Sequence, residues 1–168
     1  MVPKSPILIA AALLLTTLGS ADAAELKVRI TSYIANHRIK PVGDVEGHLA
    51  GPYLRRGLVF LETGEVGLFR STGTIETTKG NGFVKSESTY SFDDGSTLVV
   101  SVDGDVEMSP GKGIIYRKLT GTSVRGSGRY EGISGTATAT GRNLTPFSDE
   151  TRSDAYFDAV ITYTLPNK

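Results

Sequence analysis

Residues 126–136, with the sequence GSGRYEGISGT, place four glycines around Tyr130 and Ile133. Glycine in such a run indicates a positive φ angle or a close approach of two backbones, as at a corner where a strand bends. A Gly-x-Gly sequence forms a phosphate loop only when a helix follows it, but residues 136–140 alternate threonine and alanine without a helical period. The run therefore predicts a tight structural corner between two β-strands. The positions of this corner are Gly126, Gly128, Tyr130, Gly132 and Gly135.

On both sides of this corner, apolar and polar side chains alternate with a period of two, which is typical of antiparallel strands with one wet face. The alternating segments are residues 26–31, 66–76, 84–92, 98–108 and 157–165. Residues 58–61 form an unbroken apolar run, which predicts a strand buried on both faces. Turn-forming residues separate the runs. These turns are residues 63–64, 79–82, 93–95 and 109–113.

This pattern predicts an all-β protein, with one antiparallel barrel of about eight strands, because closure removes the unpaired edges of a sheet. A sandwich of two sheets is the alternative. Residues 34–52 are less regular and are expected to form a long loop or a short strand over one end of the barrel. Residues 143–153 are expected to form a second loop.

The beginning of the chain has the features of a secretory signal peptide. Lys4 precedes an apolar run in residues 6–18, and Ala21-Asp22-Ala23 is a small-x-small cleavage site. The run is too short to span a bilayer, although an uncleaved membrane anchor is the alternative. The sequence therefore predicts a signal peptide in residues 1–23, one domain in residues 24–168, and a periplasmic or secreted protein without a membrane span in its mature chain.

The composition excludes some functions. Lysine plus arginine and aspartate plus glutamate number 18 each, so no excess positive charge favours nucleic acid or an anionic membrane surface. The chain has no cysteine, which leaves neither a disulfide nor a thiol nucleophile. It also has no tryptophan, the residue on which sugar rings often stack.

Residues 126–135 follow the pattern Gly-[Ser/Thr]-Gly-basic-[Tyr/Phe]-x-Gly-x-x-Gly, which resembles the hallmark of the allene oxide cyclase and dirigent-protein barrels. Residues 119–125 and 136–140 fit the strands before and after it, and the hairpin of residues 83–108 has a similar length and order. The motif matches residue by residue only in residues 126–135. Over residues 50–165 the likeness is limited to the approximate length and order of the strands. The chain resembles a bacterial, secreted member of this superfamily.

The resemblance implies a barrel of about eight strands with a hydrophobic cavity, and a trimer as the common assembly. Some members cyclise or isomerise unsaturated small molecules without a cofactor, and others steer radical coupling. The cyclases are thought to use a cavity carboxylate, a water and an apolar pocket. Their catalytic positions match no residue of this sequence, so the catalytic residues stay unknown and no cofactor is expected.

Four residues are candidates for contact with a ligand. Glu62 flanks the apolar run of residues 58–61, as does Arg56, and is chosen as a cavity carboxylate at the barrel mouth. A tyrosine in a barrel combines an apolar ring with one hydroxyl that can orient a ligand. The tyrosines chosen on this ground are Tyr90, Tyr116 and Tyr163, and core packing is the alternative for each.

His37 and His48, with Asp44 and Glu46 between them, could form a metal site, but their spacing matches no ligand motif. Surface histidines are the preferred interpretation, and no metal is expected. Asp93 and Asp94 adjoin Gly95 and are interpreted as turn carboxylates. The acidic residues of the segment 103–107 share one strand face, which is expected to meet solvent because buried like charges would repel.

Two functions follow as hypotheses. The first is an extracytoplasmic barrel that binds a small apolar ligand or serves as a non-catalytic module. The alternative is a cofactor-free isomerase or cyclase of the allene oxide cyclase type. An apolar cavity of about 300 Å³ or more with one buried carboxylate would favour the enzyme, whereas a filled core would favour the module.

Overall fold

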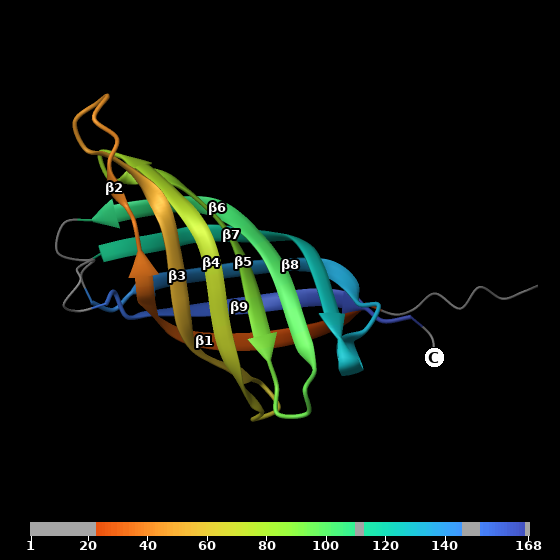
Figure 1. The fold of residues 1–168 in the computed structure, drawn as a ribbon. Helices are drawn as coiled ribbons and strands as arrows, with labels where there is room; N and C mark the ends of the chain where they lie inside the picture. Colours follow the sequence, from red (N-terminus) through yellow and green to blue (C-terminus); the bar gives the residue numbers. More distant parts are fainter. Residues whose placement is uncertain (1–22, 110–112, 146–151, 167–168) are drawn as a thin grey trace, which may run out of the picture.

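A computed structural model describes residues 23–109, 113–145 and 152–166 of the chain (Figure 1). Along the strands, buried and exposed positions alternate as predicted, because one face meets the interior and the other meets solvent. The elements are β1 (Ala24–His37), β2 (Lys40–Pro41), β3 (His48–Leu61), β4 (Val66–Thr78), β5 (Asn81–Ser91), β6 (Thr97–Ser109), β7 (Gly113–Ser127), the 3-10 turn η1 (Gly128–Tyr130), β8 (Ser134–Asn143) and β9 (Ala155–Thr164).

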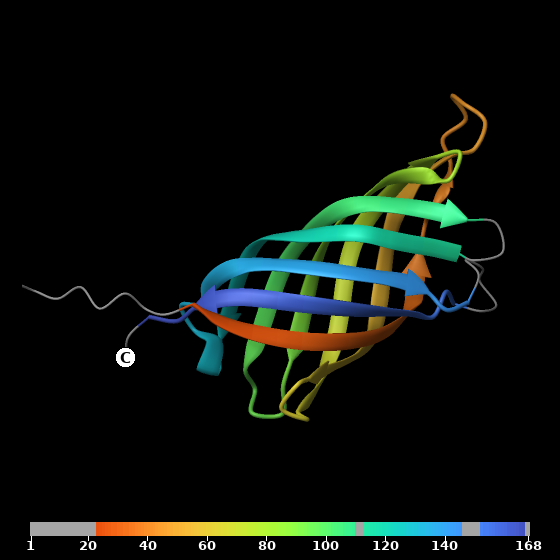
Figure 2. The same ribbon diagram turned by 180° about the vertical axis from the view of Figure 1, so that it is seen from behind.

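Eight of these strands, β1 and β3 to β9, pair with antiparallel neighbours in a closed ring. Consecutive strands from β3 to β9 are neighbours, β9 pairs with β1, and β1 pairs with β3 to close the barrel. The short β2 pairs with β3 beyond the end of β1. Strands β3 to β5 cross β7 to β9 and β1 at a steep angle on opposite sides of the molecule, and β6 bends from the first group to run beside β7 (Figure 1 and Figure 2). The predicted single barrel is therefore confirmed over the two-sheet sandwich.

The expectation of a long loop or a short strand in residues 34–52 is confirmed for residues 38–47, which hold the short β2, and is wrong at both ends of that segment. β1 continues to His37, past a register shift between Ile34 and Asn36, and β3 already begins at His48. β3 can extend this far because β4 reaches Thr78, which pairs with His48 and gives the strand a partner along its length. Residues 42–47 remain as a loop between β2 and β3.

The prediction of a strand buried on both faces in residues 58–61 is wrong for the outer face. Val59 and Leu61 point into the barrel and are buried, whereas Leu58 and Phe60 point outward and are 40% and 37% exposed. A closed barrel has one interior, and no second layer of the described chain covers the outside of β3.

The glycine-rich run forms the predicted corner between β7 and β8. Gly128 and Gly132 have φ angles of +64° and +76°, which other residues adopt only with strain. A Cβ atom on Gly126 would lie 2.6 Å from the carbonyl oxygen of Thr97, and one on Gly135 would overlap the backbone of β9. η1 turns Tyr130 inward, where it is buried. The corner therefore closes this end of the barrel.

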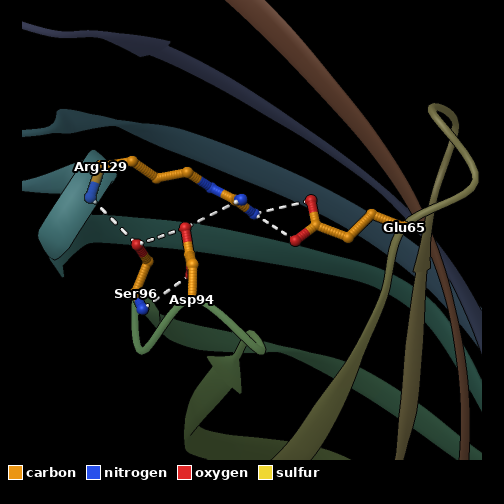
Figure 3. A network of polar contacts seen from close by, with 4 residues as sticks. All are labelled: Glu65, Asp94, Ser96 and Arg129. Atoms are coloured by element: carbon orange, nitrogen blue, oxygen red, sulfur yellow. Dashed lines mark hydrogen bonds and ion pairs between the residues drawn. The ribbon is translucent and has the colours of Figure 1, made fainter.

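Arg129 in η1 connects three turns at the same end (Figure 3). Its guanidinium donates two hydrogen bonds of 2.7 Å to the carboxylate of Glu65 and one of 3.1 Å to Asp94. The backbone N–H of Arg129 donates to Ser96 Oγ at 3.0 Å, and the guanidinium carbon lies 4.6 Å from the ring centre of Phe92. Asp94 also accepts the backbone N–H of Ser96, as expected for a turn carboxylate. We call the end that holds this network the corner end.

The predicted signal peptide in residues 1–23 lies almost wholly outside the described residues, and the first strand begins at Ala24. Within the part of the chain that the structure describes, no helix is long and apolar enough to cross a membrane.

Candidate binding site

The end of the barrel opposite the corner end holds a buried arginine. Arg55 lies on β3 and shares its inward face with Val59 and Leu61, because side chains two and four residues apart along a strand point the same way. Only 3% of its surface is exposed. Arginine is almost never fully buried without a partner, so its surroundings decide what it can do.

The Arg55 guanidinium makes four hydrogen bonds, and each acceptor is a neutral oxygen. Nη1 donates to the carbonyl oxygen of Ser153 at 3.1 Å and to Ser32 Oγ at 3.4 Å. Nη2 donates to Tyr116 Oη at 3.1 Å and to Asn143 Oδ1 at 3.0 Å. These partners come from β1, β7, β8 and the segment before β9, so the closed barrel brings them together.

Among the described residues, no carboxylate lies within ion-pair distance of Arg55. Its guanidinium carbon lies 5.8 Å from the ring centres of Tyr116 and Phe157, a contact that contributes only a fraction of the missing negative charge. Burial of a charge without a counter-ion is costly even where neutral groups satisfy its hydrogen bonds. Within the described residues, the positive charge of Arg55 therefore has no carboxylate to compensate it.

Asn143 adds an unsatisfied donor beside this charge. Its Oδ1 accepts from Arg55, which fixes the orientation of the amide, and its Nδ2 is buried without a hydrogen-bond partner. This is the single buried side-chain N or O atom without a partner among the described residues. Among the described residues, the surroundings of Arg55 thus offer neither a negative charge for the guanidinium nor an acceptor for the Asn143 amide.

A cavity of about 50 Å³ lies next to Arg55 in the barrel interior. A water molecule needs about 10–15 Å³ of such volume, so the cavity has room for a few non-hydrogen atoms. Aspartate and glutamate are absent from its described lining. The lining residues are Ile30, Tyr53, Arg55, Phe69, Ser71, Val84, Ser86, Ser88, Tyr90, Val102, Tyr116, Leu119, Ala139, Phe157 and Ala159.

Two tyrosines of the lining keep their protons well above neutral pH. Burial raises the pKa of the Tyr53 hydroxyl and, as the sole cause, that of the Tyr90 hydroxyl. Both hydroxyls can therefore donate hydrogen bonds to a ligand in the cavity.

The structure places two of the four predicted ligand residues at the cavity. Tyr90 and Tyr116 line it, and Tyr116 also holds Arg55. Tyr163 is half-buried near the end of β9 and is not among the lining residues. The choice of Glu62 as a cavity carboxylate is wrong, since it lies in the β3–β4 turn with 70% of its side chain exposed and contacts Lys27 at 3.7 Å.

Arg55 was not among the residues predicted from the sequence, although its neighbour Arg56 was considered as a residue of the barrel mouth. Arg56 points outward, as its position one residue from Arg55 requires. The alternation along the strand could have identified it. Arg55 is separated from Val59 and Leu61 by an even number of positions, so a charged side chain occupies a position that faces the core.

The two histidines lie in the region of the β2–β3 loop and are not joined in one site. His48 Nδ1 lies 2.6 Å from Asp44 Oδ1 and its Nε2 lies 3.1 Å from Glu76 Oε1, with 13% of the side chain exposed. The hydrogen bond that His48 donates to Asp44, and after it the one to Glu76, raise the pKa of His48, and the contact with His48 lowers the pKa of Asp44. His37 Nδ1 accepts the backbone N–H of Ile39 at 3.4 Å. Within the described ranges no three potential ligands are grouped to hold a metal.

The barrel is similar to the solved structures of two bacterial proteins of unknown function. A conserved protein from Rhodopseudomonas palustris aligns over 85% of this chain and 99% of its own, with a TM-score of 0.53 and 13% sequence identity. A protein from Clostridium acetobutylicum aligns over 83% of this chain and 98% of its own, with a TM-score of 0.50 and 9% identity. No protein-family model and no curated protein matches the sequence. The likeness shows the fold, and the resemblance to allene oxide cyclase and dirigent proteins stays a prediction.

Proposed function

We propose that the barrel binds a small molecule whose carboxylate contacts Arg55 in the interior. The observation that carries this proposal is the buried guanidinium of Arg55, whose hydrogen-bond acceptors among the described residues are all neutral. A carboxylate at this place would supply the missing negative charge and accept charge-assisted hydrogen bonds, which are about twice as strong as neutral ones. Phe69, Leu119 and Phe157 in the lining would contact an apolar body.

The size of the cavity sets the scale of the ligand. About 50 Å³ accommodates a group on the order of an acetate ion, at about 10–15 Å³ for each water-sized position. A longer molecule would require the side chains of the lining to move. Acetate is therefore the probe for the site, and acetamide, which has nearly the same shape and no charge, is its matched control.

The test is a titration of the wild-type protein followed by NMR of the arginine side chains. Acetate is expected to shift the Nε–Hε signal of Arg55 in a saturable way, and acetamide is expected to leave it in place. Arg129 serves as an internal control, because Glu65 and Asp94 already compensate its charge. Equal shifts with acetate and acetamide, or a larger shift at Arg129 than at Arg55, would contradict the proposal.

The alternative hypothesis of a cofactor-free isomerase or cyclase gains no support from the cavity. That hypothesis calls for a buried carboxylate, and the described lining contains an arginine, tyrosines and serines in its place. Binding accounts for the observed groups without a chemical step.

We also propose that the protein acts outside the cytoplasm, after removal of residues 1–23. The start of β1 at Ala24, directly after the predicted cleavage site, supports this proposal, since cleavage would leave the barrel complete. Mass spectrometry of the protein isolated from the producing cell is expected to give Ala24 as the first residue. A soluble cytoplasmic protein that retains Met1 would contradict it.

A further inference from the structure

The outer face of the β3–β4 hairpin carries four exposed apolar side chains next to one another. Leu58 pairs directly with Leu68 across the two strands, and Phe60 pairs with Val66. Their exposed fractions are 40% and 66% for the first pair and 37% and 42% for the second. Contiguous apolar side chains of this kind on a protein surface mark an interaction site. We call these four residues the hairpin patch.

Charged residues of opposite sign flank the hairpin patch along the strands. At one side Arg56 pairs directly with Arg70 across the strands, and among the described residues neither has an ion-pair partner. Like charges directly opposite each other destabilise a sheet. At the other side lies Glu62, with its carboxylate 70% exposed and 3.7 Å from Lys27. Along β3 the outer face therefore carries Arg56 at one side, apolar side chains in the middle, and Glu62 beside Lys27 at the other side.

We propose that a second copy of this chain docks on the hairpin patch through a two-fold axis that crosses the hairpin between Leu58 and Phe60. A two-fold interface brings the same surface of both copies together. Rotation about this axis reverses the strand direction and places Phe60 of one copy over Leu58 of the other. Arg56 of each copy then faces Glu62 of its partner, and four apolar pairs are covered at the centre.

The charges distinguish this arrangement from the other simple two-fold packing. An axis parallel to the strands would place β3 over the second copy's β4 without reversal, so that Arg56 of one copy would face Arg70 of the other. The resulting cluster of four arginines would repel. The antiparallel arrangement instead gives Arg56 of each copy an acidic partner, and it keeps the arginine pairs of the two copies apart. This inference does not depend on Arg55 or on a ligand in the interior.

Sedimentation velocity over a series of protein concentrations measures the association. The wild-type protein is expected to pass from monomer to dimer as its concentration rises. Leu68→Ser removes the most exposed apolar side chain of the patch and, because a two-fold interface contains each substitution twice, should weaken the dimer by about a hundredfold. Phe83→Ser is the matched control, since Phe83 is 44% exposed on the outside of β5 and should leave the dimer unchanged.

A charge exchange tests the orientation of the two copies. Arg56→Glu alone and Glu62→Arg alone should each weaken the dimer by about tenfold, and the double variant should restore it, because each reversed charge then meets the other. A wild-type protein that stays monomeric at the highest concentrations would overturn the proposal. A dimer or trimer insensitive to Leu68→Ser, or a double variant weaker than both single variants, would overturn it as well.

Discussion

The two ends of the barrel each hold an arginine near the interior, and the two are compensated in different ways. At the corner end, Arg129 donates to the carboxylates of Glu65 and Asp94, and its side chain is 37% exposed. At the opposite end, Arg55 is 3% exposed and its described acceptors are neutral oxygens. The more deeply buried charge is therefore the one without a counter-ion among the described residues.

This difference separates a structural role from a binding role. Arg129 joins turns that lie far apart in the sequence, and the contact with Glu65 raises its pKa further above an already high value. Nothing remains for a ligand to compensate there. Arg55 keeps a charge that the described chain does not neutralise, beside a cavity and the unsatisfied Asn143 amide. The first arginine completes the fold, and the second is available to an anion.

The largest expected effect is on ligand affinity. Arg55→Met keeps an apolar side chain of similar length but removes the charge, and should lower acetate affinity by about a hundredfold or more. Arg129→Met should leave the affinity within about twofold, because its charge is neutralised by the protein. Isothermal titration calorimetry of both variants checks this contrast. A similar loss in both would mean that the two ends do not differ as proposed.

The next effect is on the stability of the corner end. Gly128→Val and Gly132→Val place a β-branched residue at positive φ, and a Cβ atom would lie 2.5 Å from Ser96 Oγ in the first case and 2.7 Å from Pro166 Cγ in the second. Each should lower the free energy of unfolding by about 1–3 kcal/mol in urea denaturation. The control Glu131→Gln, at an exposed position, should stay within about 0.5 kcal/mol. Small and equal effects at all three positions would show that the corner is an ordinary flexible loop.

Loss of the Arg129 network should cost less than strain in the backbone. Arg129→Met removes the contacts with Glu65 and Asp94, and because the pairs are partly exposed we expect a loss of about 1–2 kcal/mol in the free energy of unfolding. High salt should reduce the difference from the wild type, since exposed ion pairs are screened. Thermal unfolding at low and high salt measures both. If Arg129→Met were as stable as the wild type, the network of Arg129 with Glu65 and Asp94 would not stabilise the corner end.

The smallest effect concerns the pH dependence of the β2–β3 loop. The pKa of His48 is raised from its ordinary 6.5, so the stability it contributes is complete below that value and is lost as the pH rises through the folded pKa. The pKa of Asp44 is lowered from 3.8, so its contribution is present above that value and is lost as the pH falls through the folded pKa. The stability difference between the wild type and His48→Gln should therefore be greatest between these values. A difference that grows above pH 6.5 would contradict the assignment.

Most of the fold could be predicted from local sequence patterns. Alternation with a period of two identified the strands, and the glycines of the corner predicted its positive φ angles at Gly128 and Gly132. The exposure of Leu58 and Phe60 was not predictable in this way, because an apolar run does not say how many layers surround its strand. The hairpin patch follows from the closure of the barrel.

Only part of the candidate site could be predicted from the sequence. Tyr90 and Tyr116 were found because aromatic residues with a hydroxyl suit a barrel interior. Arg55 was missed because its partners come from several strands, and its significance lies in the absence of a nearby carboxylate among the described residues. Glu62 was chosen for its place next to an apolar run, but the run ends at the barrel rim and the side chain turns to solvent.

The most direct test of the central claim is a crystal structure of the wild-type protein grown with acetate as its single small carboxylate, beside one grown with acetamide. With acetate, the account predicts a carboxylate in the interior cavity with an oxygen about 2.7–2.9 Å from a guanidinium nitrogen of Arg55. With acetamide, that place should hold water. A carboxylate of the protein itself against Arg55, or an acetate crystal in which Arg55 contacts only neutral oxygens, would contradict it.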